Sequence, residues 1–131
     1  MKKVFADTYY FLARLNSLDP HRSKVLAYSG ETRAQLLTTE WVLLELADAL
    51  ADTHFRKVIK DYFDFLEKQT VIIRVDDRLR RKALDCYNLH DDKRWSLTDC
   101  LSFVVMRESG VTTALTGDRH FIQAGFDAVF A

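Results

Sequence analysis

The sequence is poor in the residues that interrupt or cross-link a chain. Its 131 residues include one proline, four glycines and two cysteines. So little proline and glycine excludes collagen-like and low-complexity linker sequences, and it predicts short loops between regular elements. Cys86 and Cys100 do not have the spacing of a metal site, so reduced core thiols are favoured over a disulfide. A hydrophobic core is therefore expected to hold the fold together.

Long hydrophobic runs are also absent. No segment approaches the roughly 20 consecutive apolar residues that a membrane span requires. The N-terminal stretch MKKVFADTYY lacks the apolar core of a signal peptide. We therefore expect a soluble, cytoplasmic protein with no membrane partner.

No charge of one sign dominates, because 19 basic residues balance 19 acidic ones and the formal net charge is +0. This balance neither indicates nor excludes a nucleic-acid partner, because a local basic face can coexist with a local acidic pocket. Hydrophobic residues make up 48% of the chain and charged residues 29%. This composition and length predict a single globular domain over residues 1–131.

The chain alternates short apolar segments with longer helical patterns. Strands are predicted over residues 4–6, 35–39, 71–75, 111–116 and 128–130. Their lack of polar alternation is typical of strands buried on both faces. Helices are predicted over residues 8–16, 21–29, 40–52, 55–68, 77–88 and 97–109. The alternation predicts an α/β fold with three layers, α/β/α, around a mainly parallel sheet of about five short strands.

Four acidic residues follow predicted strands or lie in the helices that come next. Asp7 follows the first strand and Asp118 the fourth, whereas Glu45 and Asp99 lie in the helices over 40–52 and 97–109. The carboxyl ends of parallel strands share one edge of the sheet, so the four acids are expected to converge. Converging carboxylates repel one another unless a cation neutralises them, and oxygen ligands favour Mg²⁺ or Mn²⁺ over Zn²⁺. Such a site is suited to attack by water on a phosphodiester.

Each acid, taken alone, also has a purely structural interpretation. Asp7 fits a helix N-cap, and Asp99 fits the last position of a capping box. Asp118 fits a turn, and Glu45 fits one member of a solvated helix face. The metal-site hypothesis depends on all four acids meeting at the same edge.

Four segments carry these acids and together resemble the motifs of a known family: FADTYYFLA, TTEWVLLELADAL, SLTDCLSFVVM and ALTGDRHF. In order and spacing they resemble the four motifs of PIN-domain proteins, most of all the small ribonucleases of the VapC toxin type. The resemblance runs from Asp7 to Phe121. It implies a Mg²⁺- or Mn²⁺-dependent endoribonuclease that cleaves RNA, is neutralised by a cognate antitoxin protein and forms a homodimer.

The resemblance places the acidic quartet of the family on Asp7, Glu45, Asp99 and Asp118. It implies that the three aspartates hold the metal, while Glu45 orients the attacking water or binds a second cation. Thr8 and Thr116 match hydroxyl residues that support the quartet. Tyr9 departs from the small residue that is more usual at its position, and this departure concerns the shape of the pocket mouth.

Basic residues indicate where RNA could lie. Lys93, Arg94 and Arg119 flank the proposed acidic pocket and are the candidates for phosphate contacts. The denser basic run over residues 78–82 is interpreted as a solvated helix face. His120 lies beside Asp118 and could approach substrate, but a surface or capping role is favoured.

Aromatic residues are less specific. Trp95 and Tyr9 each fit stacking on a base, a place in the core, or an interface. By analogy with the family, an antitoxin helix would dock in an apolar groove if the helices within residues 8–68 leave one.

Three other functions remain open. A receiver-type signalling domain also gathers acids at a sheet edge, but it requires paired acids after the first strand and a lysine after the last. Here Asp7 stands alone, and no lysine follows Lys93. The other two are a PIN-like module that binds RNA or protein without cutting, and an RNA-processing nuclease outside any toxin–antitoxin pair.

Overall fold

The computed structural model describes residues 2–31 and 33–131. Its strands are β1 (Lys3–Ala6), β2 (Gln35–Thr39), β3 (Val71–Ile73), β4 (Thr113–Leu115) and β5 (Asp127–Ala128). They form one sheet in the order β3-β2-β1-β4-β5, and every neighbouring pair is parallel. The predicted α/β class and the parallel sheet of five short strands are therefore confirmed.

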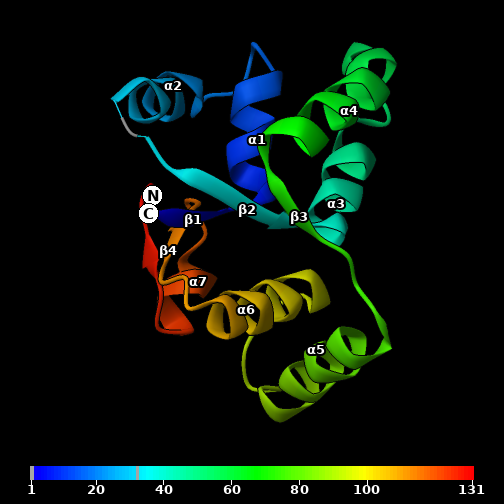
Figure 1. Ribbon diagram of the computed structural model, residues 1–131, viewed down its shortest axis with the longest axis vertical. Coiled ribbons are helices and arrows are strands. Elements are labelled where there is room, and N and C mark those ends of the chain that lie inside the picture. The colour runs from blue at the N-terminus through cyan, green and yellow to red at the C-terminus, as the bar shows by residue number, and fades with distance from the viewer. Residues whose placement is uncertain (1, 32) are drawn as a thin grey trace.

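The helices cover both faces of this sheet (Figure 1). They are α1 (Thr8–Leu15), α2 (Arg22–Glu31), α3 (Glu40–Leu50), α4 (Ile59–Gln69), α5 (Asp77–Leu89), α6 (Leu97–Ser109) and α7 (Arg119–Gln123), with a 3-10 helix η1 (His54–Val58) before α4. Helices α1 to α4 lie on one side, α6 and α7 lie on the other, and α5 packs on α6 (Figure 1). This arrangement is the predicted three-layer α/β/α architecture.

Some boundaries differ from the predicted ones for local reasons. The helix predicted over 55–68 opens as the 3-10 helix η1, where the Thr53 side chain accepts a hydrogen bond from the Phe55 amide at 3.2 Å. Strand β3 ends at Ile73 because the Val75 amide donates to Oε1 of Glu40 and not to a neighbouring strand. Helix α7 was not predicted, because its five residues are too few to show a helical period.

The core lies on both faces of the central strand β1. Phe5 in this strand is fully buried and packs against Phe121 of α7, with ring centroids 6.3 Å apart. Phe121 also meets Phe103 of α6 edge to face, at 5.0 Å between centroids. Each such buried side chain contributes roughly 1.5–3 kcal/mol to the free energy of unfolding. The core therefore fixes α6 and α7 rigidly over the strands that carry the candidate site.

The register of the sheet brings distant residues to one edge. Ala6 pairs with Leu115, so the residues that follow them, Asp7 and Thr116, leave adjacent strands at the same level. Strand β2 ends at Thr39, whose side chain caps α3 by accepting from the Val42 amide at 3.2 Å. Three strand ends thus deliver α1, α3 and the segment before α7 to one place.

No helix within residues 2–31 and 33–131 has both the length and the apolar character needed to cross a bilayer.

Candidate active site

Asp7 connects β1 to α1, and its side chain is buried, with 6% of its surface exposed. Its backbone occupies the N-cap position of α1, but its carboxylate accepts no capping hydrogen bond. Oδ2 of Asp7 instead accepts a hydrogen bond from Oγ1 of Thr116 at 2.8 Å. The capping interpretation does not explain this acid, because its carboxylate is held by the residue that follows β4.

The environment of Asp7 disfavours its charged form. The pKa of the Asp7 carboxyl is raised from 3.8 to about 7, mainly by burial and to a smaller extent by the carboxylates of Asp99 and Glu45, although hydrogen bonds from the Thr116 side chain and the Thr8 backbone oppose this rise. In the part of the chain that the structure describes, no basic side chain forms an ion pair with Asp7. An ionised Asp7 therefore lacks an ion-pair partner among the described residues.

Glu45 reaches the same edge from α3. Its Oε1 accepts a hydrogen bond from the hydroxyl of Thr8, the first residue of α1, at 2.5 Å. Thr8 is itself buried. The two threonines singled out in the sequence thus each hold one acid: Thr8 holds Glu45, and Thr116 holds Asp7.

Asp99 has the capping role considered for it. It closes a capping box at the start of α6, because its amide donates to Oγ of Ser96 at 2.9 Å and its Oδ2 accepts from the Ser96 amide at 3.1 Å. The same Oδ2 lies 3.0 Å from Nδ1 of His120. The cap therefore fixes the rotamer of Asp99 and leaves its carboxylate facing α7.

Asp118 caps α7 in a similar way. Its Oδ1 accepts from the His120 amide at 2.9 Å, and its own amide donates to Oγ1 of Thr116 at 3.0 Å. Nδ1 of His120 lies 3.4 Å from Oδ1 of Asp118. The turn interpretation of this acid is thus correct, and the turn presents the carboxylate to the imidazole.

Asp99, Asp118 and His120 form a candidate cation site. One ligand atom from each residue lies within 4.8 Å of the others. Asp7 is outside this trio. The charge of Asp99 contributes to the raised pKa of Asp7, and the Thr116 hydroxyl contacts both the Asp7 carboxylate and the Asp118 amide. Two carboxylates and an imidazole, with a buried carboxylate nearby, are a donor set that fits a divalent cation.

His120 is the site residue for which the sequence favoured a surface or capping role over an approach to substrate. Its imidazole lies between two of the predicted acids. The available signal was its position two residues after Asp118, at the first turn of a short helix. The contact of His120 with the two acids depends on the packing of α7 against α6, which the sequence does not reveal.

The predicted RNA-contact residues lie on the surface around this edge. Lys93 and Arg94 are exposed and line a hollow of about 450 Å³ that reaches Ser96 at the start of α6. Arg119, also exposed, directly follows Asp118. Lys93 pairs with its neighbour Asp92 at 3.2 Å, so it is held near this surface by an exposed ion pair.

The basic run over residues 78–82 is partly committed to packing between helices. Arg78 and Lys82 of α5 form ion pairs with Glu108 of α6, at 2.8 and 2.6 Å. These two contacts hold the pKa of Glu108 down at about 2. All four basic residues of the run are exposed, as the solvated-face interpretation predicts, and Arg78 and Lys82 also join the two helices through surface ion pairs.

The two aromatic residues proposed for stacking are packed inside the fold. Trp95 is 7% exposed, its Nε1 donates to Oε1 of Gln123 at 3.0 Å, and its ring meets Phe103 edge to face. Tyr9 stacks on His21, with ring centroids 4.7 Å apart, and on Phe130. Of their alternative roles, the structure supports a place in the packing.

Tyr9 also explains the glycine before Asp118. A Cβ atom at Gly117 would lie 2.6 Å from Cε2 of the Tyr9 ring. The large side chain at position 9 therefore fills the space beside the loop that carries Asp118. The shape of the pocket mouth depends on this pair.

No protein-family model matches the sequence, and no curated protein matches it. Solved structures do match. VapC20 from Mycobacterium tuberculosis, described as a sarcin–ricin loop cleaving toxin, has a TM-score of 0.88 and 24% sequence identity, covering 96% of this chain and 98% of that one.

Two further structures are similar in fold. FitAcB from Neisseria gonorrhoeae has a TM-score of 0.64 and 16% identity, covering 98% of this chain and 96% of that one. VapBC2 from Rickettsia felis, bound to a DNA fragment from its promoter, has a TM-score of 0.64 and 11% identity, covering 92% and 91%. The chain therefore has the fold of the VapC-type structures, as the resemblance of its sequence to PIN-domain proteins predicted.

Proposed function

We propose that this chain is a metal-dependent endoribonuclease that hydrolyses RNA phosphodiester bonds at the edge formed by Asp7, Glu45, Asp99 and Asp118. The observation that carries the proposal is the Asp7 carboxylate, which is buried beside other carboxylates and has no ion-pair partner among the described residues. A divalent cation supplies the missing counter-charge. The fold shared with VapC20 supports this function over the other functions considered.

The three aspartates of this edge would hold Mg²⁺ or Mn²⁺, and His120 would stand beside them. A bound cation lowers the pKa of its water and stabilises the charge that develops on the phosphate. Oxygen donors suit both ions, and an imidazole nitrogen adds preference for Mn²⁺. The donor set thus fits the cations that the family resemblance implies.

The side chains of the protein perform the remaining steps. Glu45, oriented by its hydrogen bond from Thr8, aligns the attacking water and accepts its proton. Thr116 keeps the Asp7 carboxylate turned towards the edge. Lys93, Arg94 and Arg119 contact the RNA backbone and set its register without selecting sequence.

Cleavage of an RNA pool by the purified protein tests this proposal. The pool includes a ribosomal RNA fragment with the sarcin–ricin loop, and reactions contain Mg²⁺, Mn²⁺ or EDTA. Cutting is expected with metal only, and Asp7→Asn and Asp99→Asn should abolish it. An asparagine at position 99 retains an oxygen that can accept from the Ser96 amide, so thermal unfolding of that variant should stay close to wild type.

Cutting by a folded Asp7→Asn variant, or cutting by the wild type in EDTA, would contradict the metal-site assignment. RNA binding without cutting under either metal would favour the PIN-like binding module.

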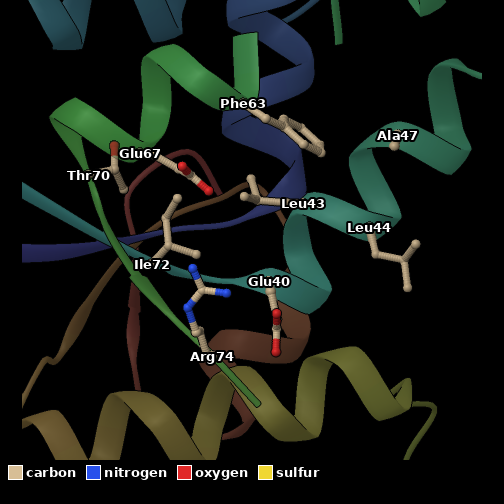
Figure 2. Close-up of a pocket in the computed structure, with 9 residues that line it drawn as sticks. All are labelled: Glu40, Leu43, Leu44, Ala47, Phe63, Glu67, Thr70, Ile72 and Arg74. Carbon is tan, nitrogen blue, oxygen red and sulfur yellow. The ribbon is translucent and has the colours of Figure 1, made fainter. Parts of the chain in front are cut away.

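We also propose that the chain is the toxin of a toxin–antitoxin pair. The fold shared with VapC20 and with VapBC2, which is bound to a DNA fragment from its promoter, supports an antitoxin partner for this chain. A groove of about 500 Å³ lies between α3, α4 and β3, and Figure 2 shows the residues that line it. Its apolar wall includes Leu43, Ala47, Phe63 and Ile72, and two glutamates and Arg74 add charged groups, so an amphipathic antitoxin helix fits it.

Co-expression with the product of the adjacent small gene tests this partner. The partner should co-purify and suppress cleavage, and Ala47→Arg should weaken both effects by filling the groove. Cleavage without any neutralising neighbour would favour the RNA-processing nuclease. The homodimer and the cytoplasmic location belong to the same proposal, and sedimentation and cell fractionation measure them.

A further inference from the structure

A second hollow adjoins the acidic edge, between α3 and the start of α6. It has a volume of about 330 Å³ and is lined by Trp41, Leu44, Glu45, Asp48, Leu97 and Thr98. The four residues from α3 follow the spacing i, i+3, i+4 and i+7, so they form one face of that helix. Glu45 belongs both to this hollow and to the acidic edge, where it accepts from Thr8. Whatever occupies the hollow therefore lies next to the proposed scissile phosphate.

Trp41 gives the hollow its apolar wall. Its ring is half-buried against the core, and within residues 2–31 and 33–131 it has neither an aromatic partner nor an acceptor for its indole N–H. Trp95, in contrast, is packed and hydrogen-bonded. Leu44, which is 59% exposed, extends the wall. Such a surface suits a flat ring that stacks on it.

The polar groups around this wall select the chemistry of the occupant. Glu45 and Asp48 present carboxylates, which accept hydrogen bonds and repel phosphate, and Thr98 adds a hydroxyl. The matching ligand is a flat aromatic ring with N–H donors on its edge and no negative charge of its own. The volume lies at the lower end of the range for small-ligand sites.

We propose that this hollow binds an unpaired nucleobase of the RNA substrate, guanine in preference to the others, beside the phosphate that is cleaved. The proposal rests on the proposed ribonuclease function. Guanine presents two adjacent donors, N1–H and the N2 amino group, to a carboxylate such as that of Asp48. Uracil presents one donor between two acceptors, which the same carboxylate repels. The base stacks on Trp41, and its position brings the adjoining phosphate to Glu45.

Binding measured without cleavage tests this site. The probes are short polypyrimidine RNAs with or without one central guanine, and their fluorescence anisotropy is recorded in EDTA at fixed low salt. The proteins compared are wild type, Trp41→Ala, Trp41→Phe and Phe65→Ala. Trp41→Ala should weaken binding of the guanine RNA roughly 5- to 100-fold. Trp41→Phe should retain most of the affinity because it keeps a stacking face. Phe65→Ala removes an exposed ring outside the hollow and should change nothing.

Two further readouts separate stacking from a structural effect. The guanine RNA should quench the tryptophan fluorescence of wild type but not that of Trp41→Phe, because Trp95 is buried. Asp48→Asn should bring the affinities for guanine and adenine RNAs close to each other, with an unchanged melting temperature. The hollow is not a base site if folded Trp41→Ala binds the guanine RNA within twofold of wild type.

The hollow is also not a base site if Trp41→Ala dissociates a dimer without changing RNA affinity. A second copy of the chain would then cover this face. The two proposals fail in distinguishable ways. RNA binding that depends on Trp41, without metal-dependent cutting, would support the base site and contradict the nuclease proposal. Metal-dependent cutting with the same KM in wild type and Trp41→Ala would support the nuclease proposal and contradict the base site.

Discussion

The hydroxyl of Thr116 donates to Oδ2 of Asp7 across 2.8 Å, although 109 positions separate the two residues. The pairing of Ala6 with Leu115 places both just beyond the ends of adjacent parallel strands. The same hydroxyl oxygen accepts from the amide of Asp118 at 3.0 Å. One fully buried threonine thus joins the acid after β1 to the main chain that carries the acid after β4.

Thr116→Val tests this connection, because valine has the same shape but neither donates nor accepts. The buried Asp7 carboxylate then loses a donor and the partly buried Asp118 amide loses its acceptor, which should lower the free energy of unfolding by roughly 1–3 kcal/mol. Cleavage should also fall, since Asp7 and Asp118 lose their common anchor. Thr116→Ser retains the hydroxyl and should preserve most of the activity. Urea unfolding and initial cleavage rates measure the two effects, and a Thr116→Val variant with wild-type stability and cleavage rate would contradict the role of the hydroxyl.

Gly117→Ala should be destabilising because of Tyr9. The new Cβ would meet the Tyr9 ring at 2.6 Å, and such overpacking costs typically 1–3 kcal/mol. The strain displaces either the ring or the loop that carries Asp118, so the cleavage rate should fall as well. Tyr9→Leu in the Gly117→Ala background should recover stability relative to the sum of the single changes. A double-mutant cycle by thermal unfolding measures this coupling, and strict additivity would contradict it.

The stability of the metal-free protein should depend on pH through Asp7. A pKa raised from 3.8 to about 7 means that between these values the folded state keeps a proton that the unfolded state has released. Raising the pH through this window therefore lowers the free energy of unfolding, by up to about 4 kcal/mol, and the contribution is complete only below pH 4.

Asp7→Asn provides the matched control for this pH dependence, because other groups titrate equally in both proteins. The difference in unfolding free energy between wild type and Asp7→Asn should change across pH 4–7 in EDTA. Saturating Mn²⁺ should reduce that change, since the cation replaces the proton. A difference that stays constant with pH would contradict the raised pKa.

His120→Ala should weaken Mn²⁺ binding roughly 10-fold or more, because the imidazole contacts both Asp99 and Asp118. Isothermal titration with Mn²⁺ measures this without requiring any cleavage. His120→Asn serves as the conservative variant, since its amide can still contact one carboxylate. Unchanged Mn²⁺ affinity in folded His120→Ala would limit this residue to capping and surface roles.

Removing a phosphate contact should change the salt dependence of RNA binding. Replacing Lys93, Arg94 or Arg119 by alanine should reduce the slope of log affinity against log salt by about 0.7 each. Arg78→Ala is the matched control, because Arg78 is engaged by Glu108 and lies outside the proposed path. An equal change of slope in Arg78→Ala would instead indicate a non-specific effect of net charge.

Much of the fold was predictable from the sequence because each signal is local. Apolar runs such as residues 35–39 identify buried strands, and Ser96 with Asp99 marks the start of a helix that the structure places at Leu97. The alternation of strands and helices then predicts a parallel sheet. Helix α7 and the early end of β3 could not be predicted, because they depend on a short turn and on a side chain from α3.

The candidate site, like the fold, could be predicted from the sequence only in part. The sequence by itself determined which acids follow the strands, because parallel topology sends them to one edge. Only the tertiary structure decided how each acid is held: Thr116 binds Asp7, Thr8 binds Glu45, and His120 lies between two other acids. It also decided that Trp95 is packed while Trp41 faces a hollow. Burial and side-chain contacts arise between segments far apart in the chain, so no local pattern encodes them.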